Sequence, residues 1–302
     1  MKKILLTGDR PTGKLHLGHY VGSLKRRVNM MKDYESYIMV ADIQALTDNF
    51  DNPQKVRDNI FEVVADNLAV GVDPQKATFF IQSQIPQIAE LTVLFSNLVT
   101  ISELKRNPTV KKEISEKKRL FGEDGSSVTF GFLGYPISQI ADITFLNAEI
   151  IPVGEDQKPM IELARNIVRK FNKLYGKTFI EPRSYVGEIP RLLGLDGHKM
   201  SKSLNNAIYL SDNREEIEKK IKKTITDSEN KVYFDLENKP GVSNLMTYYQ
   251  IATNKSYKEI EKEFKNITYY IEFKKKIIDS LDKFLEPIRK RRRVYEENPQ
   301  IV

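Results

Sequence analysis

Near its amino terminus the chain reads ILLTGDRPTGKLHLGH, residues 4–19. The apolar run at 3–7 predicts a short buried β-strand closed by Gly8, and the periodic residues at 17–31 predict a helix. A helix that begins soon after a strand offers free backbone N–H groups and the positive end of its dipole, and both favour phosphate. This stretch therefore predicts a parallel α/β fold with an anion site after its first strand.

Three more apolar runs lie in the first two thirds of the chain, at 37–41, 78–81 and 149–153. Helical patterns occur at 53–70 and at 156–174. Buried strands that alternate with helices are typical of βαβ units, so we predict an α/β fold with a parallel sheet.

The last third of the chain has no buried strand pattern after about Leu210. Residues 212–215 and 256–259 resemble capping boxes, in which an N-cap side chain and an acid three residues later bond each other's backbone. Apolar residues then recur at helical spacing in two stripes, Ile217, Ile221 and Ile225, and Ile277, Leu281, Phe284 and Leu285. We therefore predict an α/β domain at 1–208 and a helical domain at 209–302.

The composition excludes several classes of protein. Among 302 residues there is no cysteine, so no disulfide framework, thiolate nucleophile or cysteine-ligated metal is available. No apolar run approaches the roughly 18–20 residues that span a bilayer. The apolar start stops at Asp9, too early for a signal peptide, so we expect a cytoplasmic protein with no membrane partner. The mild excess of 48 Lys and Arg over 41 Asp and Glu suggests a polyanionic partner.

The turn after the first strand allows two interpretations. Residues 8–15 read GDRPTGKL, one residue away from the P-loop pattern, and Asp42 ends the next strand as a Walker B acid would. A P-loop needs a hydroxyl at position 15 to ligate Mg²⁺, and leucine has none. The other interpretation rests on the HLGH segment, residues 16–19, whose histidines can donate to phosphate while Gly18 lets a purine approach the backbone. Two half-exposed histidines at a helix end are its plain alternative.

A second motif favours the HLGH interpretation. The KMSKS segment, residues 199–203, follows a turn-rich stretch and offers two lysines and two serines. A loop of this composition can close over a triphosphate and neutralise developing charge, although such a pentad alone is usually a solvated surface loop. The three histidines of the chain, His16, His19 and His198, all lie in or beside these two motifs.

With these motifs the sequence resembles the class I aminoacyl-tRNA synthetases, and most closely the bacterial tryptophanyl-tRNA synthetases. The resemblance runs from the first strand to about residue 295. The segments that carry it are TGDRPTGKLHLGHYVGSL (7–24), LAVGVDP (68–74), FIQSQIP (80–86), YPISQIADI (135–143), IPVGEDQKPMIE (151–162), KMSKSLNN (199–206) and TDS (226–228). Such relatives usually continue a few dozen residues beyond Val302.

The resemblance implies a Rossmann-type doubly wound parallel sheet with a C-terminal all-helical, anticodon-binding domain, usually in a homodimer. It also implies a reaction in which the carboxylate of L-tryptophan attacks the α-phosphate of ATP and pyrophosphate leaves. The aminoacyl group then passes to tRNA(Trp). Because the nucleophile is already ionised, positioning and charge stabilisation should suffice, with Mg²⁺ bound through the phosphates and no metal site in the protein.

The resemblance places several short segments on ATP. Their residues are Arg10, Pro11, Thr12, Gly18, His19, Gly154, Glu155, Asp156, Leu192, Lys199, Met200, Ser201, Lys202 and Ser203. The residues expected to act in catalysis are His16, His19, Lys199 and Lys202, with the lysines on the pentacovalent phosphate and the leaving pyrophosphate. Glu155 and Asp156 have a structural alternative, since acids at a helix start complement its dipole.

The resemblance also implies an amino-acid pocket formed by Leu6, Gln44, Tyr135, Gln139, Asp142 and Gln157. Tyr135, Gln139 and Asp142 are spaced to share one helix face. Asp142 lies in an apolar stretch, where a buried acid needs a donor, and the indole N–H is a donor only. The alternative is a solvated helix acid. The family often has histidine where Gln44 stands and an aliphatic residue where Gln139 stands.

Residues 289–293 read RKRRR, the densest basic run of the chain. Such a run usually marks a solvated helix surface. The resemblance puts it near the RNA-binding domain, so we expect Arg291 and Arg292 to contact tRNA phosphates.

Three other functions share part of this pattern. A tyrosyl-tRNA synthetase has both signature motifs, although residues 152–157 resemble the tryptophan enzymes. A small nucleotidyltransferase can share the H-x-G-H segment, but it lacks a long helical C-terminal third. A non-catalytic paralogue that binds RNA is disfavoured by two intact motifs.

Overall fold

The computed structural model describes residues 2–186, 192–198, 200, 204 and 206–302. The chain divides into two compact units, and each gathers segments that are far apart in the sequence. The first unit comprises Met1–Gly13, Arg27–Val63 and Val72–Glu188, and the second comprises Lys14–Arg26, Val64–Gly71 and Ile189–Val302.

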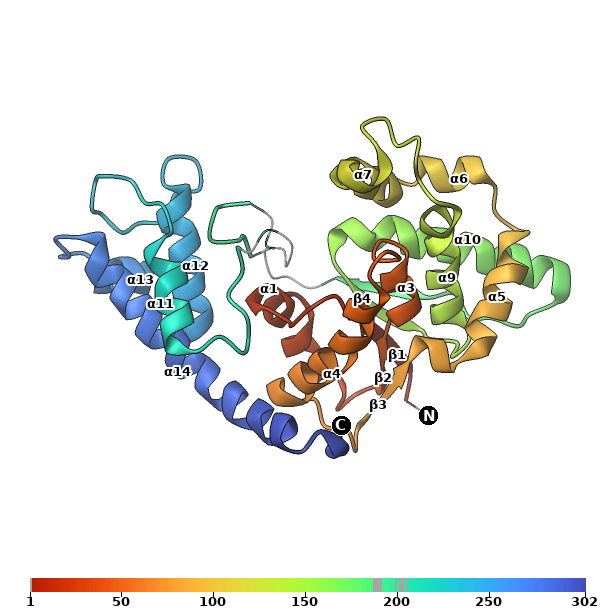
Figure 1. Cartoon of the computed structure of the whole chain (residues 1–302), viewed down its shortest axis with the longest axis horizontal. Coiled ribbons are helices and arrows are strands. Elements are labelled where there is room, and N and C mark those ends of the chain that lie inside the picture. Colours follow the sequence, from red (N-terminus) through yellow and green to blue (C-terminus); the bar gives the residue numbers. More distant parts are fainter. Residues whose placement is uncertain (1, 187–191, 199, 201–203, 205) are drawn as a thin grey trace. The chain divides into compact units, whose positions relative to one another are not determined.

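The first unit is built on a parallel sheet that has five strands within the described residues, in the order β3-β2-β1-β4-β5 (Figure 1). The strands are β1 (Ile4–Asp9), β2 (Glu35–Val40), β3 (Ala77–Ile81), β4 (Ile150–Val153) and β5 (Arg183–Val186). The α/β doubly wound prediction is confirmed, as are the first four strands. The sequence missed β5 because its residues, RSYV, are mostly exposed and form no apolar run.

The strand order reverses at β1. The chain passes from β1 outward to β2 and β3, and then returns to place β4 on the other side of β1. The carboxyl ends of β1, at Asp9, and β4, at Val153, are therefore neighbours in the sheet. Ligands of open parallel sheets bind at such a reversal point, because the loops that follow the two strands part there.

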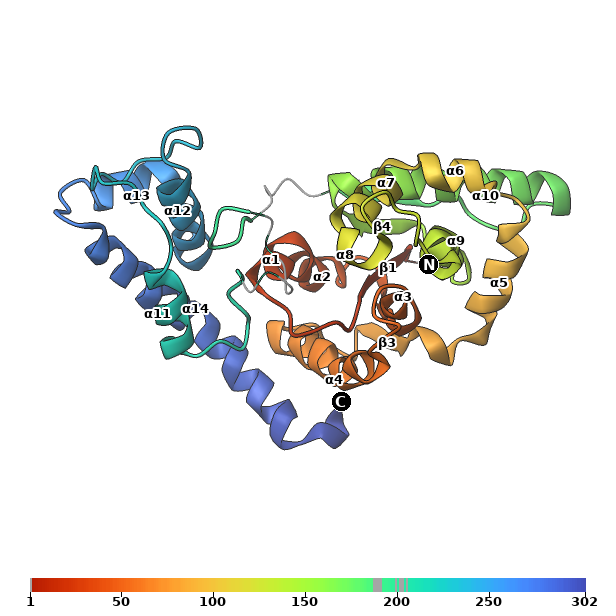
Figure 2. The same ribbon diagram turned by 45° about the horizontal axis from the view of Figure 1, so that its top comes forward.

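Two helices of the first unit cover one face of the sheet. Leu6 and Ile151 of the central strands form a buried cluster with Ile143 of α9 (Phe130–Thr144) and Ile161 of α10 (Lys158–Tyr175). A second cluster joins α9 and α10 to α5 (Pro86–Ser96) and α6 (Ile101–Arg106), and Figure 2 shows these helices gathered together. The other helices here are α3 (Asp42–Leu46), α7 (Pro108–Glu116) and α8 (Lys118–Phe121).

The two helical patterns of the amino-terminal part are confirmed. The one at 53–70 is a single helix, α4 (Pro53–Val70). The one at 17–31 consists of three consecutive segments: α1 (Leu17–His19), the π-helix η1 (Tyr20–Leu24) and α2 (Lys25–Met30).

The second unit contains the helices of the last third of the chain, and the sequence patterns marked all of them but the second. They are α11 (Arg214–Lys222), α12 (Pro240–Thr253), α13 (Tyr257–Glu263) and α14 (Tyr270–Glu297), followed by the short η5 (Pro299–Ile301). Both α11 and α12 contact α14, and α13 contacts α12. None of the described helices is both long and apolar enough to cross a bilayer.

Two details of the predicted helical part are wrong. The first capping box is formed by Asn213 and Glu216, one residue later than predicted, because the Asp212 carboxylate instead accepts the backbone N–H of Tyr209 and pairs with Lys220. Ile225 is 83% exposed, since α11 ends at Lys222 and the helical spacing no longer applies there. The capping box of Ser256 and Glu259 is confirmed.

We expect Gly8→Ala to destabilise the first unit. Gly8 lies in β1, and a β-carbon there would stand 2.8 Å from the carbonyl oxygen of Met39 in the neighbouring strand. That oxygen belongs to the backbone and cannot move aside without disturbing the sheet, so a loss of about 1–3 kcal/mol is expected. Thermal unfolding measures it, with Gly131→Ala as the control because a β-carbon at Gly131 meets nothing within 4 Å. Equal melting temperatures for the two variants would contradict the expectation.

Candidate functional site

A buried carboxyl group lies on α9 of the first unit. Asp142 is 1% exposed, and its Oδ1 accepts a hydrogen bond of 2.8 Å from Nε2 of Gln82, the residue that follows β3. Gln82 is itself fully buried, and its Oε1 accepts the backbone N–H of Gln44 at 3.0 Å. Gln44, Gln82 and Asp142 therefore form one hydrogen-bonded chain from α3 to α9.

The second oxygen of Asp142 has no partner. Its Oδ2 is buried and makes no hydrogen bond within the described residues. Burial raises the pKa of Asp142 to about 7, against the lowering effect of the Gln82 hydrogen bond, and the nearby charge of Asp42 raises it further. A buried acceptor left open in this way is suited to a ligand that brings its own donor.

Asp142 differs in this respect from the other buried aspartates. Among the described residues four aspartates are buried: Asp9, Asp66, Asp142 and Asp212. Asp9 pairs with Arg27, Asp66 with Arg292 and Asp212 with Lys220, so each of these three carboxylates faces a cation. Within the described residues, the carboxyl group of Asp142 forms no ion pair and its hydrogen-bond partner is the neutral amide of Gln82.

Three further predicted pocket residues belong to the same unit as Asp142. Tyr135 is buried on α9, and burial raises the pKa of its hydroxyl. Leu6 of β1 belongs to the same buried cluster as Ile143, the residue after Asp142. Gln139 lies between Tyr135 and Asp142 on α9, as the predicted spacing requires.

The remaining pocket residue, Gln157, lies in another turn. It ends the short η3 (Glu155–Gln157), which follows β4 at the carboxyl edge of the sheet. Gln139 and Gln157 are both half-buried, and no hydrogen bond joins either of them to Asp142 within the part of the chain that the structure describes.

The turn after β4 is fixed from α7. Thr109, in the first turn of α7, donates its hydroxyl to the backbone carbonyl of Asp156 at 2.8 Å. The predicted residues Gly154, Glu155 and Asp156 are exposed in this turn, and Glu155 pairs with Lys158 at 2.7 Å. The turn thus presents its polar atoms to solvent at the carboxyl end of β4.

Two cations lie together after β1. The Arg10 guanidinium pairs with the carboxylate of Asp48, and that carboxylate also binds Nζ of Lys117 at 2.6 Å. Lys117 in addition lies 4.7 Å from the centre of the Phe132 ring. The sequence identified Arg10 but missed Asp48 and Lys117, which no local pattern connects to it. Both cations therefore share the single carboxylate of Asp48.

The second unit brings the two signature segments together. The backbone N–H of Leu17 donates to the carbonyl of Ile208 at 2.9 Å, and that of Leu210 donates to the carbonyl of Leu15 at 3.0 Å. The HLGH segment is therefore paired, in antiparallel fashion, with the residues that come shortly after the KMSKS segment. A β-carbon on Gly18 would lie 2.9 Å from the His16 ring and 3.0 Å from Sδ of Met200, so glycine allows this close approach.

The histidines of the HLGH segment contact each other. Their ring centres are 3.8 Å apart, and the backbone N–H of His16 donates to Nδ1 of His19 at 3.2 Å. His16 is buried and His19 half-buried. With Nδ1 accepting, the neutral imidazole of His19 carries its proton on Nε2, which makes Nε2 a donor.

Helix α12 holds the backbone at residues 193 and 194, a few positions before the KMSKS segment. Asn244 donates to the carbonyl of Gly194 and the hydroxyl of Tyr248 to that of Leu193, both at 2.8 Å. The predicted residues Leu192 and Met200 are buried. Lys199, Ser201, Lys202 and Ser203 lie outside the described residues.

The expectation for the basic run is wrong at Arg292. This residue is 1% exposed and pairs with the buried Asp66 and with Glu296, so its charge is not presented to an RNA. Nε of Arg291 donates to the carbonyl of Ala69 at 2.5 Å, although its side chain is exposed. The sequence pattern could not show this, because Asp66 lies more than two hundred residues away.

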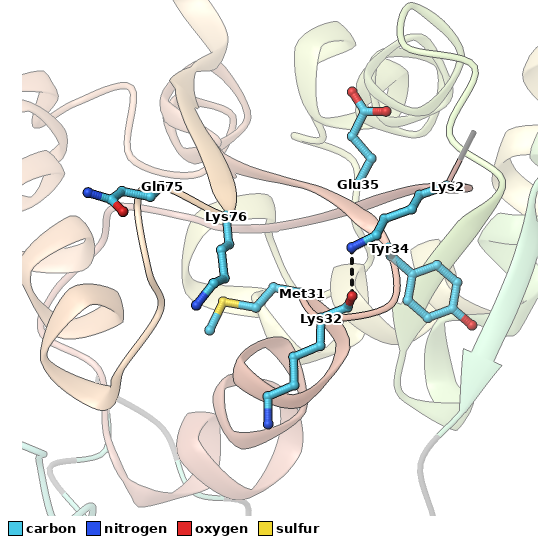
Figure 3. A pocket seen from close by; sticks show the side chains of 7 residues that line it. All are labelled: Lys2, Met31, Lys32, Tyr34, Glu35, Gln75 and Lys76. Atoms are coloured by element: carbon cyan, nitrogen blue, oxygen red, sulfur yellow. Dashed lines mark hydrogen bonds between the residues drawn. The ribbon is translucent and has the colours of Figure 1, made fainter.

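A groove of about 700 Å³ lies at the opposite edge of the sheet, where β1 and β2 begin (Figure 3). Its residues are Lys2, Met31, Lys32, Tyr34, Glu35, Gln75 and Lys76. Lys2 donates to the carbonyl of Lys32 at 2.6 Å. Since this groove lies at the amino ends of the strands, it is separate from the site built around Asp142.

Comparison with known proteins gives consistent matches. The model of the family "tRNA synthetases class I (W and Y)" matches residues 2–286. A tryptophan–tRNA ligase of Clostridium longisporum is 48% identical over 98% of this chain and 88% of its own length. A crystal structure of the Campylobacter jejuni tryptophanyl-tRNA synthetase, complexed with ADP and tryptophan, is similar with a TM-score of 0.85 and 28% identity, over 98% of this chain and 90% of that one. An Archaeoglobus fulgidus tyrosyl-tRNA synthetase, 22% identical over 96% of this chain and 90% of that one, shares the fold with a TM-score of 0.74.

We expect the stability of the ligand-free protein to depend on pH through Asp142. With its pKa raised to about 7 in the folded state and near about 3.9 in the unfolded chain, the folded state holds an extra proton between these pH values. The contribution of Asp142 to the free energy of unfolding therefore falls as the pH rises from about 4 to about 7. Above about pH 7 it stays at this lower value. Asparagine does not ionise, so Asp142→Asn should gain melting temperature relative to the unmodified protein as the pH rises over this range.

The matched control is Asp73→Asn. The Lys76 side chain holds the pKa of Asp73 below its usual range, so the stability that this half-buried aspartate contributes is lost only as the pH falls below about 4. Asp73→Asn should therefore show no trend relative to the unmodified protein between about pH 5 and about pH 8. A difference between Asp142→Asn and the unmodified protein that is constant from pH 4 to pH 8 would contradict a raised pKa.

Proposed function

Because the chain belongs to the class I tRNA synthetases of the tryptophan and tyrosine group, we propose that it is a tryptophan–tRNA ligase. The main support for this proposal is that the chain is 48% identical to such a ligase over 98% of its length. The enzyme activates L-tryptophan with ATP, releases pyrophosphate, and transfers the tryptophanyl group to tRNA(Trp). The alternative, a nucleotidyltransferase that uses no tRNA, is disfavoured because such a protein lacks a long helical C-terminal part like α11 to α14.

The chemistry needs positioning more than proton transfer. The carboxylate of tryptophan attacks the α-phosphate of ATP, the bond to the bridging oxygen breaks, and that oxygen leaves on pyrophosphate. No proton moves in this step, so the protein has to align two anions and stabilise the charge of the transition state. Mg²⁺, bound through the phosphates, would supply part of that stabilisation.

The pocket around Asp142 supports recognition of the indole. The open Oδ2 accepts the indole N–H, and the Gln82 hydrogen bond at 2.8 Å fixes the carboxyl group so that this oxygen stays turned to the ligand. Tyr135 and Gln157 hold the substrate amino group. Leu6, Gln44 and Gln139 complete the pocket, with Gln44 held through its backbone by Gln82.

The ATP site combines residues of both signature segments. His19 offers Nε2–H to a phosphate oxygen, and the backbone at Gly18 approaches the adenosine. Arg10, beside Pro11 and Thr12, binds phosphate after β1, and the turn 154–156 approaches the ribose or the phosphates. Leu192 lies near the adenine, and Lys199 and Lys202 stabilise the transferring phosphate and the pyrophosphate.

The partners follow from the same proposal. Residues 1–208 form the catalytic domain, and residues 209–302 form a helical domain that binds the anticodon of tRNA(Trp). The protein acts in the cytoplasm as a homodimer. A net charge of +7 favours an RNA partner, and the fully buried Arg292 is excluded from that contact.

ATP–pyrophosphate exchange tests the function directly. We expect exchange with tryptophan and none above background with tyrosine, followed by transfer of tryptophan to tRNA(Trp). Exchange with tyrosine alone would show a tyrosyl enzyme. The absence of exchange with any amino acid, in a protein that binds ATP, would refute a synthetase.

We expect Asp142→Ala to raise the KM for tryptophan about 10- to 100-fold, because a hydrogen bond to a buried charged group is lost. The KM for ATP should stay nearly unchanged, since Asp142 is not among the residues assigned to ATP. Exchange measured at varied tryptophan and varied ATP separates the two constants. Equal rises in both would show that Asp142 acts through the structure of the unit rather than through the indole.

A further inference from the structure

We propose that Asp66 and Arg292 are positioning residues for the HLGH segment. Through them the last third of α14 holds the backbone from which His16, Gly18 and His19 project. This inference rests on the proposed function, since it assigns the HLGH segment to ATP. All the contacts that carry it lie within the second unit.

Asp66 uses its two oxygens for two different segments. Its Oδ2 accepts the backbone N–H of Leu15 at 2.6 Å, and its Oδ1 accepts a hydrogen bond from Nη1 of Arg292. Asp66 lies on α4 and is fully buried, while Arg292 lies on α14 and is 1% exposed. A single carboxylate therefore joins α14 to the residue that directly precedes His16.

The pairing makes the position of Asp66 depend on α14. A carboxylate with no exposed surface stays ionised only if a cation and donors compensate its lost hydration. Arg292 supplies that cation, and its Nε is in turn bound to Glu296 at 2.9 Å. Without Arg292 the carboxylate loses this cation and its link to α14, so its hydrogen bond to Leu15 is no longer held in one geometry.

The peptide of Leu15 is held on both sides. Its N–H is bound by Asp66, and its carbonyl accepts the N–H of Leu210 at 3.0 Å. The next peptide N–H, that of His16, is the one that donates to Nδ1 of His19. A displacement of the Leu15 peptide therefore also displaces the His16 N–H, whose hydrogen bond to Nδ1 keeps the proton of the neutral His19 imidazole on Nε2.

Two more contacts tie α14 to the same region. Nε of Arg291 donates to the carbonyl of Ala69, near the end of α4, at 2.5 Å. Phe284 of α14 contacts the ring of Tyr20, which directly follows His19, edge to face at 5.3 Å between ring centres. The helix therefore supports the HLGH segment from its start and from the residue after its end.

The test compares Arg292→Met with the matched variant Lys239→Met. Lys239 is also a buried cation of the second unit, paired with Asp227 and Glu229 and bonded to the hydroxyl of Tyr270. In the part of the chain that the structure describes, Lys239 has no hydrogen bond to the HLGH segment, so the loss of its side chain reports the general cost of breaking a buried ion pair. Both variants are assayed below their melting temperatures.

We expect Arg292→Met to lower kcat/KM for ATP in tryptophan-dependent exchange by about tenfold or more, the scale of one lost charge-assisted hydrogen bond. The dissociation constant of tryptophan should stay unchanged, because the pocket around Asp142 belongs to the first unit. Since the chain contains no tryptophan, the fluorescence of the ligand itself measures this constant when it is excited at a wavelength that the 14 tyrosines of the protein scarcely absorb. Lys239→Met should lose melting temperature and keep its kcat/KM for ATP.

Arg292→Lys gives a second, milder variant in case Arg292→Met does not fold. Lysine keeps the charge but not the planar donors of the guanidinium, so it should restore part of the ATP-dependent activity and all of the tryptophan affinity. The proposal is overturned if Arg292→Met, or Arg292→Lys in its place, matches Lys239→Met in kcat/KM for ATP. A failure of the proposed function is distinguishable, because the unmodified protein would then show no tryptophan-dependent exchange.

Discussion

The backbone pairing of Leu15 and Leu17 with Ile208 and Leu210 is the interaction on which the organisation of the site depends. Two hydrogen bonds, of 2.9 and 3.0 Å, join backbone groups that are nearly two hundred residues apart and bring the HLGH segment beside the residues that follow the KMSKS segment. This pairing places residues 14–26 in the unit of the C-terminal helices rather than in the unit that contains β1. Short segments that are separated in the sequence become neighbours because their backbone groups satisfy one another.

Buried carboxylates occur in both units, and those that pair with a cation differ from Asp142, which bonds a neutral amide. Asp9 with Arg27 and Asp66 with Arg292 are buried ion pairs, and each also holds backbone: Arg27 bonds the carbonyl of Gly8, and Asp66 the N–H of Leu15. Such pairs are expensive to bury and specify one geometry, since either member alone would be an uncompensated charge. Among the described residues Asp142 has no cation opposite it, and its raised pKa and open oxygen reflect that difference. The exception among the buried carboxylates is thus the one proposed to meet a substrate.

The sequence predicted most elements of the fold because their signals are local. Apolar runs that end in Gly8, Gln82 or Gly154 gave three strands of the sheet, and helical periodicity gave α4 and α10 with nearly their observed bounds. The failures also have local causes. Strand β5 has no apolar run, Ile225 continues a helical spacing beyond the end of its helix, and the capping box begins at Asn213 because Asp212 already has other partners. The sequence identified candidate site residues that lie in a motif or directly after a strand. It missed the roles of Asp48, Gln82, Asp66 and Arg292, because no local pattern connects these residues to their partners.

The sequence by itself determined the class of fold, the two signature segments and the face of α9 that carries Tyr135, Gln139 and Asp142, because each follows from residues within a few turns of one another. It also determined that three histidines and no cysteine are available for chemistry. Only the tertiary structure decided which groups meet: Gln82 with Asp142, Leu15 with Leu210, and Arg292 with Asp66 instead of with an RNA. The physical reason is that the partner of a buried polar group is selected by the packing of distant segments, and this selection leaves no pattern in the sequence around either member.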